Sequence, residues 1–261
     1  MNGFTAGAGR EVSRYVRVDL RESGEGRMTG HAPVSRHLCG PDGAVRTGAL
    51  LTFIDNVGGI CGGLAALPDG WVVSTNLAAR VVNNATVGPV RIDASVLRRG
   101  RNSVVTAVQV RDEGADDVLV ADGVLTSAIL VPENGPPQWE RPVVLDAGAF
   151  DSDADAPPLE EWMGVRAIDA HGLEIALADE LRNPWGILHG GVVASLVDLT
   201  TATSGRTTDV VLHFLAPNRI GPVRATATVL GTRSDGDVCR VEVRDIGADR
   251  VTAVAVVTAR E

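Results

Sequence analysis

Two short motifs recur in this chain at one fixed spacing, which divides the chain into two similar halves. The segment GPVR occupies 88–91 and again 221–224, and VQVRDEGAD at 108–116 returns as VEVRDIGAD at 241–249. The step along the chain from 88 to 221 equals the step from 108 to 241, so both motifs repeat in the same register. A period this long exceeds any solenoid unit and indicates two fused domains of similar fold. With 261 residues, the chain is long enough for two small domains.

A third pair of matching segments lies upstream and has a different spacing. RTGALLTFID at 46–55 matches HGGVVASLVD at 189–198. The step from 55 to 198 is longer than the step from 88 to 221, which places an insertion of about ten residues in the first half. We assign it to GICGGLAALPDGWV around 59–72, whose glycines and Pro-Asp-Gly predict a helix end and a longer loop.

Both halves predict the same order of secondary structure. An alternating strand (Val12 to Leu20; Gly164 to Leu177) is followed by a loop and by an almost wholly apolar helix at about 47–62 and 190–203. A helix that is apolar on all sides must be buried all round. Four β-rich runs follow, which predict an antiparallel meander wrapped around the helix and hence an α+β fold. In the second half these runs lie at about 207–216, 222–232, 237–246 and 250–259.

The domain boundaries follow from the repeat and from composition. We expect a first domain at 1–135 and a second at 161–261. The stretch 136–160 is rich in Pro and Asp and predicts a linker that is partly extended and lies on the surface.

Composition excludes several classes of function. The net charge of −9 argues against nucleic acid as a partner and supplies no polybasic patch for a membrane surface. No apolar run reaches the ~18 residues of a membrane span, and the N-terminus has no apolar core of a secretory signal. Cys39, Cys61 and Cys239 form no CxxC, which argues against a disulfide framework or structural zinc and favours a reducing cytoplasm. Aromatic residues make up only 3% of the chain, so a Val- and Ala-lined cleft slightly favours aliphatic ligands.

The segment NPWGILHGGVVASLVD at 183–198 predicts a loop that turns directly into a buried helix. Gly190 and Gly191 leave the first N–H groups of that helix approachable, and free N–H groups there hold an anion or a developing oxyanion. Asp198 follows about two turns deeper, where a carboxylate inside an apolar helix needs a partner or a function.

These motifs resemble hotdog-fold acyl-CoA thioesterases related to the phenylacetate-pathway and hydroxybenzoyl-CoA thioesterases. The resemblance covers nearly the whole chain, taken as two tandem hotdogs. It implies that each half is an antiparallel sheet around a long central helix, and that the halves pair into one continuous sheet. It also implies an acyl-CoA substrate, no metal or redox cofactor, and association into a homo-oligomer, a dimer or trimer of such units. The residues that carry it are Asn183, Gly186, His189, Gly190, Gly191, Asp198 and the strand TTDVVLHFLAP at 207–217.

In that family each active site is built across the pair of hotdogs. The resemblance therefore implies a catalytic site that joins Asn183, His189 and Gly190 of the second half to Asp55 and Ser74 of the first. The Gly190 N–H would hold the oxyanion, and Asp55 would act either as general base or as nucleophile. Asn183 would orient the water or the thioester, and Ser74 would hydrogen-bond the carboxylate or the water.

The second composite site is expected to be degenerate. Asp198 and Thr207 would supply its carboxylate and hydroxyl, but Gly40, Arg46 and Thr47 stand where the motif has Asn, His and Gly. We therefore predict one working site per chain.

Substrate-binding contacts are assigned to Gly191 and to the densest basic cluster of the chain. Arg98, Arg99 and Arg101 could meet the phosphates of coenzyme A, while a solvated turn explains the cluster equally well.

Structural explanations stand beside each of these assignments. The two glycines of the motif could merely allow close packing, and Asp55 or Asp198 could be satisfied by neighbouring groups. His189 is better explained by hydrogen bonds that fix the loop than by proton transfer, and Thr75 would replace Ser74 after a one-residue change of register. The functional alternatives are a non-catalytic acyl-CoA-binding or regulatory module and a hotdog hydratase or dehydratase.

Overall fold

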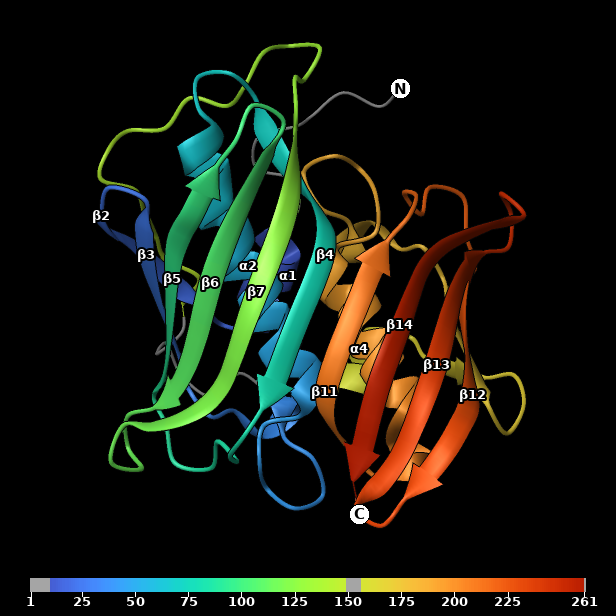
Figure 1. Cartoon of the computed structure of the whole chain (residues 1–261). Coiled ribbons are helices and arrows are strands. Elements are labelled where there is room, and N and C mark those ends of the chain that lie inside the picture. The colour runs from blue at the N-terminus through green and yellow to red at the C-terminus, as the bar shows by residue number, and fades with distance from the viewer. Residues whose placement is uncertain (1–9, 149–155, 261) are drawn as a thin grey trace.

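One antiparallel sheet runs through the molecule, and its two long helices lie on the same face (Figure 1). The computed structural model describes residues 10–148 and 156–260. Within these residues the sheet has 13 strands, in the order β8-β2-β3-β5-β6-β7-β4-β11-β14-β13-β12-β10-β9. The order of the second half mirrors that of the first about the β4–β11 pair, so the prediction of two tandem hotdogs in one continuous sheet is confirmed.

The first half contains the N-terminal helix, the longer core helix and six strands. They are α1 (Arg10–Tyr15), β2 (Asp19–Gly24), β3 (Arg27–Ala32), the 3-10 turn η1 (Arg36–Leu38), α2 (Thr47–Ala66), β4 (Trp71–Val81), β5 (Val90–Arg99), β6 (Ser103–Asp112) and β7 (Val118–Leu130).

The connection and the second half repeat this order in shorter form. They contain β8 (Val144–Leu145), α3 (Leu159–Trp162), β9 (Arg166–Ala167), β10 (Gly172–Ile175), η2 (Asp179–Leu181), α4 (Gly190–Thr201), η3 (Ala202–Ser204), β11 (Arg206–Phe214), β12 (Val223–Arg233), β13 (Gly236–Asp245) and β14 (Arg250–Arg260).

The two halves meet at β4 and β11 and again at their core helices. The strands pair from Arg80 with Asp209 to Asn76 with His213. Behind this seam the N-terminal parts of α2 and α4 approach so closely that only glycine fits. A Cβ at Gly48 would lie 2.9 Å from the Ser195 Cα, and a Cβ at Gly191 would lie 2.8 Å from the Thr52 Cα. This contact brings the start of each helix against the middle of the other.

Helix α2 is a buried core helix. Its length and composition would suffice to cross a membrane, but 83% of its most apolar window is buried inside the molecule. Leu50, Phe53 and Ile54 are fully buried against the sheet, so the apolar surface of α2 is satisfied by the protein itself.

The sequence prediction was wrong at the start of each half. Residues 12–15 belong to helix α1, because Val12, Tyr15 and Val16 recur at helical spacing and are all buried. The first strand begins only at Asp19. In the second half the predicted strand from Gly164 to Leu177 is divided into the short strands β9 and β10.

The insertion lengthens a helix instead of ending it. Helix α2 has 20 residues, whereas α4 has 12. The glycines that predicted a helix end lie inside α2, where they allow close packing against the sheet: a Cβ at Gly63 would lie 2.6 Å from the Trp71 ring. The helix stops before Pro68, which disfavours a helical conformation at Leu67.

Part of the predicted linker joins the first-half sheet. Strand β8 pairs with β2 through Leu145 and Leu20, and Val143 is buried. The domain boundaries at 135 and 160 stay a prediction.

Candidate active site

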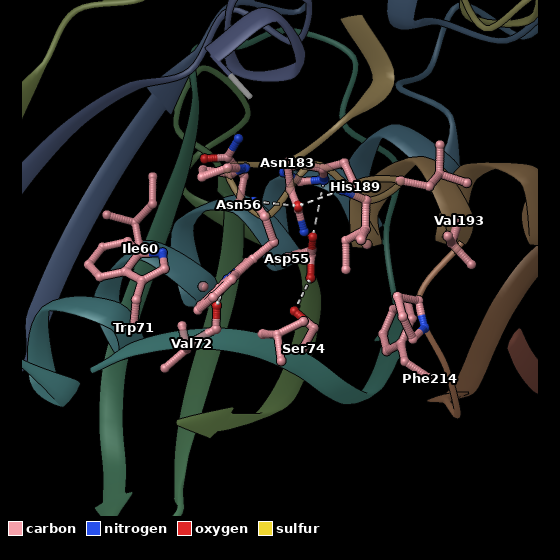
Figure 2. A pocket seen from close by; sticks show the side chains of 18 of the residues that line it. Asp55, Asn56, Ile60, Trp71, Val72, Ser74, Asn183, His189, Val193 and Phe214 are labelled. Carbon is pink, nitrogen blue, oxygen red and sulfur yellow. Dashed lines mark hydrogen bonds and ion pairs between the residues drawn. The ribbon is translucent and has the colours of Figure 1, made fainter. Parts of the chain in front are cut away.

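The Asp55 carboxylate lies between the two halves, at the start of the opposing helix. Asp55 belongs to α2, and its Oδ2 accepts a 2.8 Å hydrogen bond from the Gly191 N–H at the start of α4. Its Oδ1 accepts a 2.6 Å hydrogen bond from the Ser74 hydroxyl. Figure 2 shows this carboxylate pointing into a pocket between the halves. A carboxylate can accept about four hydrogen bonds, so two of its sites remain for a water or a substrate.

Gly190 leaves both space and a free donor beside this carboxylate. A Cβ at position 190 would lie 2.8 Å from both Asp55 oxygens, so a larger residue would displace the carboxylate. The Gly190 N–H has no hydrogen-bond partner among the described residues, and the residue is partly exposed to the cavity. The helix start therefore presents an available N–H donor with the positive end of the helix dipole behind it.

A β-bulge decides which hydroxyl reaches Asp55. The register of β4 against β7 shifts between Ser74 and Asn76. As a result Ser74 faces Asp55, while the Thr75 hydroxyl donates to the Thr126 carbonyl at 3.0 Å.

His189 is the N-cap of α4. Its Nδ1 accepts a 3.0 Å hydrogen bond from the Gly191 N–H and lies 3.2 Å from the Asp55 Oδ2. Burial lowers the pKa of His189, and the nearby Asp55 carboxylate offsets this only in part. A neutral ring that accepts at Nδ1 carries its proton on Nε2. The side chain thus fixes the loop and the helix start.

Asn183 stabilises the loop before α4 through its side-chain oxygen, and its side-chain NH₂ group can still donate hydrogen bonds. Its Oδ1 accepts from the N–H groups of Trp185 (2.9 Å) and Ile187 (3.4 Å), and Gly186 takes a positive φ of 69° in this turn. No described residue accepts from its Nδ2. Asn183 and Asp55 point into the same part of the pocket (Figure 2).

All five predicted catalytic residues line one cavity of about 320 Å³. They are Asp55, Ser74, Asn183, His189 and Gly190.

The walls of the cavity correct the expectation of an aliphatic lining. Trp71, Trp139 and Trp185 line it together with Phe214, although the whole chain has only four tryptophans. The Trp71 and Trp139 rings stack with their centroids 6.1 Å apart. The Trp185 Nε1 donates to the Val72 carbonyl at 2.8 Å. Sequence reasoning missed these residues because overall composition says nothing about where a scarce residue type gathers.

The second site keeps its carboxylate contact. The Asp198 Oδ2 accepts a 2.8 Å hydrogen bond from the Gly48 N–H, which repeats the contact of Asp55 with Gly191. Burial raises the pKa of Asp198, although hydrogen bonds from Thr207 and Gly48 work against this shift.

Larger side chains stand at the helix start beside this second carboxylate. Thr47 stands where the first site has Gly190; it is 2% exposed, and its hydroxyl donates to the Thr207 carbonyl at 2.8 Å. Arg46 stands in the place of His189 and pairs with Glu160 of α3 at 2.6 Å. None of these residues lines the cavity.

The predicted substrate-binding residues are not among those that line the cavity. Gly191 is buried, and its N–H bonds to Asp55 and His189, so a contact of this residue with substrate stays a prediction. Arg98, Arg99 and Arg101 do not line the cavity, and Arg99 pairs with Asp69. Their contact with coenzyme A stays a prediction.

Comparison with known proteins finds a partial match to one family model and a wider likeness to solved structures. Residues 42–118 match the family model of the thioesterase superfamily. No curated protein sequence matches the chain.

Several solved structures share the whole double-hotdog architecture. A TesB protein from Mycobacterium avium subsp. paratuberculosis superposes with a TM-score of 0.64 at 11% identity, over 96% of this chain and 97% of the other. A putative oleoyl thioesterase from Lactobacillus plantarum gives 0.63 at 12% identity, over 90% and 96%. A 12:0-ACP thioesterase from Umbellularia californica gives 0.61 at 14% identity, over 89% and 93%. At these identities the likeness shows the fold.

Proposed function

We propose that this double-hotdog chain, of which residues 42–118 match the thioesterase superfamily, hydrolyses acyl-CoA thioesters at one composite site between its halves. One observation carries the proposal: a carboxylate from the first half lies against a helix start of the second half, beside a cavity and an N–H donor that bonds to no described residue.

The proposed role of the Gly190 N–H is to stabilise the carbonyl oxygen of the thioester as it becomes negative. The donor is fixed at a helix start, so it needs no reorganisation during the reaction. Removal of one such donor typically costs about 3–4 kcal/mol of transition-state stabilisation.

The proposed role of Asp55 is to supply the oxygen nucleophile, in one of two ways. As a general base it would take a proton from a water whose oxygen attacks the carbonyl carbon. The C–S bond then breaks, and the coenzyme A thiolate takes up the proton. As a nucleophile, an Asp55 oxygen would attack the carbonyl carbon itself and expel the thiolate, and water would hydrolyse the resulting anhydride. In both cases the Ser74 hydroxyl donates to the Asp55 Oδ1, and the Gly191 N–H donates to the Asp55 Oδ2.

The two carboxylates provide a matched test of this proposal. We expect Asp55→Asn to lower kcat/KM by about 10²- to 10⁴-fold, measured as thiol release from a panel of acyl-CoA substrates. Asp198→Asn is the control and should retain most of the turnover, because Arg46 and Thr47 stand where the first site has His189 and Gly190. The reverse result would overturn the site assignment.

Two outcomes of this assay would favour other functions. Binding of acyl-CoA without turnover by the wild-type protein would favour a non-catalytic binding module. The protein could instead hydrolyse acyl thioesters of a carrier protein and leave acyl-CoA intact. That result would support thioester hydrolysis but replace coenzyme A with a carrier protein as the thiol part of the substrate.

A further inference from the structure

The cavity beside Asp55 has an exposed side and a buried side. Phe214 and Leu215, at the end of β11, line it in the second half, and Leu215 is 56% exposed. Trp71 and Val72, at the start of β4, line it in the first half and are 7% and 6% exposed. Figure 2 shows Trp71 and Phe214 on opposite sides of Asp55, so the carboxylate lies between the buried side and the exposed side.

The two ends of an acyl-CoA thioester differ in the same way. Its phosphates stay in water, because burial of an unpaired charge is costly, whereas the carbon atoms of the acyl group gain from burial. In the proposed reaction the thioester lies at Asp55 and the Gly190 N–H. The acyl group therefore extends to the buried side, toward Trp71, and coenzyme A leaves the cavity past Leu215.

The buried side is walled by two tryptophans from different parts of the chain. Trp139 belongs to the segment between the two halves and stacks on Trp71, with the ring centroids 6.1 Å apart and an angle of 16° between the planes. Pro137 and Leu145 of the same segment line the cavity beside them. Trp139 itself lines the cavity and is partly exposed, so a group inside the cavity can contact it.

The tryptophan pair lies well away from the carboxylate along α2. A Cβ at Gly63 would lie 2.6 Å from the Trp71 ring, and Gly63 follows Asp55 by eight residues. At a rise of 1.5 Å per residue this separation is about 12 Å along the helix axis. Gly59 and Ile60, which lie between these two points, also line the cavity. An acyl chain that follows α2 from the thioester therefore reaches the tryptophans only if it is long enough.

The architecture that both halves share does not require this wall. The repeat that matches Ser74 with Thr207 matches Trp71 with Ser204. Gly63, against which the Trp71 ring packs, lies in the part of α2 that extends beyond the length of α4. The tryptophan pair is therefore a feature of the first half alone, where the buried side of the cavity lies.

We infer that Trp139 sets the upper length of the acyl group that the cavity accepts. This inference rests on the proposed thioesterase function. A short or medium-length acyl group packs its carbon atoms along α2 and ends against the two indole rings. An extended palmitoyl chain is longer than this path, so its end meets the ring of Trp139, and overfilling of a packed apolar site is destabilising. The substrates are then thioesters of short and medium-length acyl groups.

The test is a series of straight-chain acyl-CoA substrates, from acetyl to palmitoyl, compared by kcat/KM for thiol release. For wild type we expect kcat/KM to rise with chain length and then to fall by about 10-fold or more once the chain exceeds the cavity. Trp139→Ala removes the ring and should move the maximum to longer chains. The ratio of kcat/KM for palmitoyl-CoA to that for butyryl-CoA should rise by about 10- to 100-fold. Trp139→Phe keeps a smaller ring and should move the maximum less.

Phe214→Ala is the matched control, because it removes an aromatic ring from the same cavity on the other side of Asp55 (Figure 2). It should leave the maximum at the wild-type chain length, whatever it does to the overall rate. Thermal melting checks that every variant is folded. If Trp139 only supported the fold, its replacement would lower kcat/KM by the same factor at every chain length.

The outcomes separate this inference from the proposed function. A maximum that stays in place in the folded Trp139 variants overturns the role of Trp139, and so does a wild type that hydrolyses palmitoyl-CoA as well as shorter substrates. A maximum that moves to longer chains in Phe214→Ala alone would place the acyl group on the other side of Asp55 and overturn it too. If no acyl-CoA is hydrolysed, the proposed function fails. The Kd values of the same series, measured by calorimetry, then still test whether Trp139→Ala favours longer chains.

Discussion

Asp55 and Gly191 are 136 residues apart in the chain and are joined by a 2.8 Å hydrogen bond from the Gly191 N–H to the Asp55 Oδ2. The same contact recurs between Asp198 and Gly48, also at 2.8 Å. This contact therefore ties the two helices together at both sites. The sites differ at the preceding residue of the helix start, which is Gly190 in one and Thr47 in the other.

Gly190→Ala should inactivate the proposed enzyme. The new Cβ would meet both Asp55 oxygens at 2.8 Å, which forces the carboxylate away from the helix start. We expect kcat/KM to fall by at least about 10²-fold, because the donor and the carboxylate lose their alignment. Steady-state thiol release measures this. Thr47→Ala is the control at the second site, and a loss of activity there equal to that of Gly190→Ala would contradict the single-site model.

Ser74→Ala should lower turnover more than Thr75→Ala. Ser74 donates a 2.6 Å hydrogen bond to Asp55, whereas the Thr75 hydroxyl is bound to the Thr126 carbonyl. Removal of one hydrogen bond to a charged group costs about 1.5–3 kcal/mol, so kcat/KM should fall about 10- to 100-fold in Ser74→Ala. Equal effects of the two substitutions would argue against a role for the bulge in selecting the hydroxyl.

Asp198→Asn should change how stability depends on pH. Burial raises the pKa of Asp198 in the folded protein, so the folded state holds this proton more tightly than the unfolded state. The contribution of Asp198 to stability is therefore greatest below its unfolded pKa of about 3.9, and it is lost as pH rises through the higher folded pKa. The stability of Asp198→Asn relative to wild type should thus improve from pH 4 to pH 7 in denaturant titrations. A difference that stays constant over this range would show that the carboxyl is not perturbed.

Asp245→Asn should destabilise the protein most at neutral pH. Burial alone would raise the pKa of Asp245, but its carboxylate accepts from the N–H groups of residues 219–221, and the net effect is a lowered pKa. A lowered folded pKa gives stability that is present above the unfolded pKa of about 3.9 and is lost as pH falls through the folded value. We expect Asp245→Asn to cost about 1–3 kcal/mol at pH 7 and less at pH 3. The equivalent carboxylate of the first half, Asp112, accepts from the N–H groups of residues 86–88. Asp112→Asn should therefore show the same dependence of stability on pH in denaturant titrations.

The repeat made the fold predictable, since the spacing that separates GPVR from its second copy also separates Asp112 from Asp245. The family resemblance then supplied the hotdog architecture. Local errors arose where tertiary packing overrides local signals. The glycines of α2 predicted a helix end, but the Trp71 ring fills the space that Gly63 leaves open and the helix continues.

The polar residues of the candidate site could be predicted from the sequence better than the aromatic residues that line its walls. Asn183 and Gly190 stand in one recognisable motif, and the repeat pointed to Asp55 as their partner. Asn56, which also lines the cavity, was missed, although an amide next to Asp55 in a mostly apolar helix was a usable signal. Trp139 could not have been placed, because it reaches the cavity from the segment that predicted a linker.

The sequence by itself determined that two related domains occur in this chain and that only one loop keeps the Asn and the His-Gly-Gly start. Repeats, spacing and residue types are local properties of the chain, so they can be recognised without coordinates. Only the tertiary structure decided that the Gly191 N–H bonds to Asp55 while no described residue accepts from the Gly190 N–H, that Thr47 is buried at the start of α2, and that three tryptophans line the first site. These facts depend on how closely two helices and a sheet approach one another. In such close packing, shifts of tenths of an ångström at a glycine decide whether a backbone N–H is hydrogen-bonded within the protein or faces the cavity.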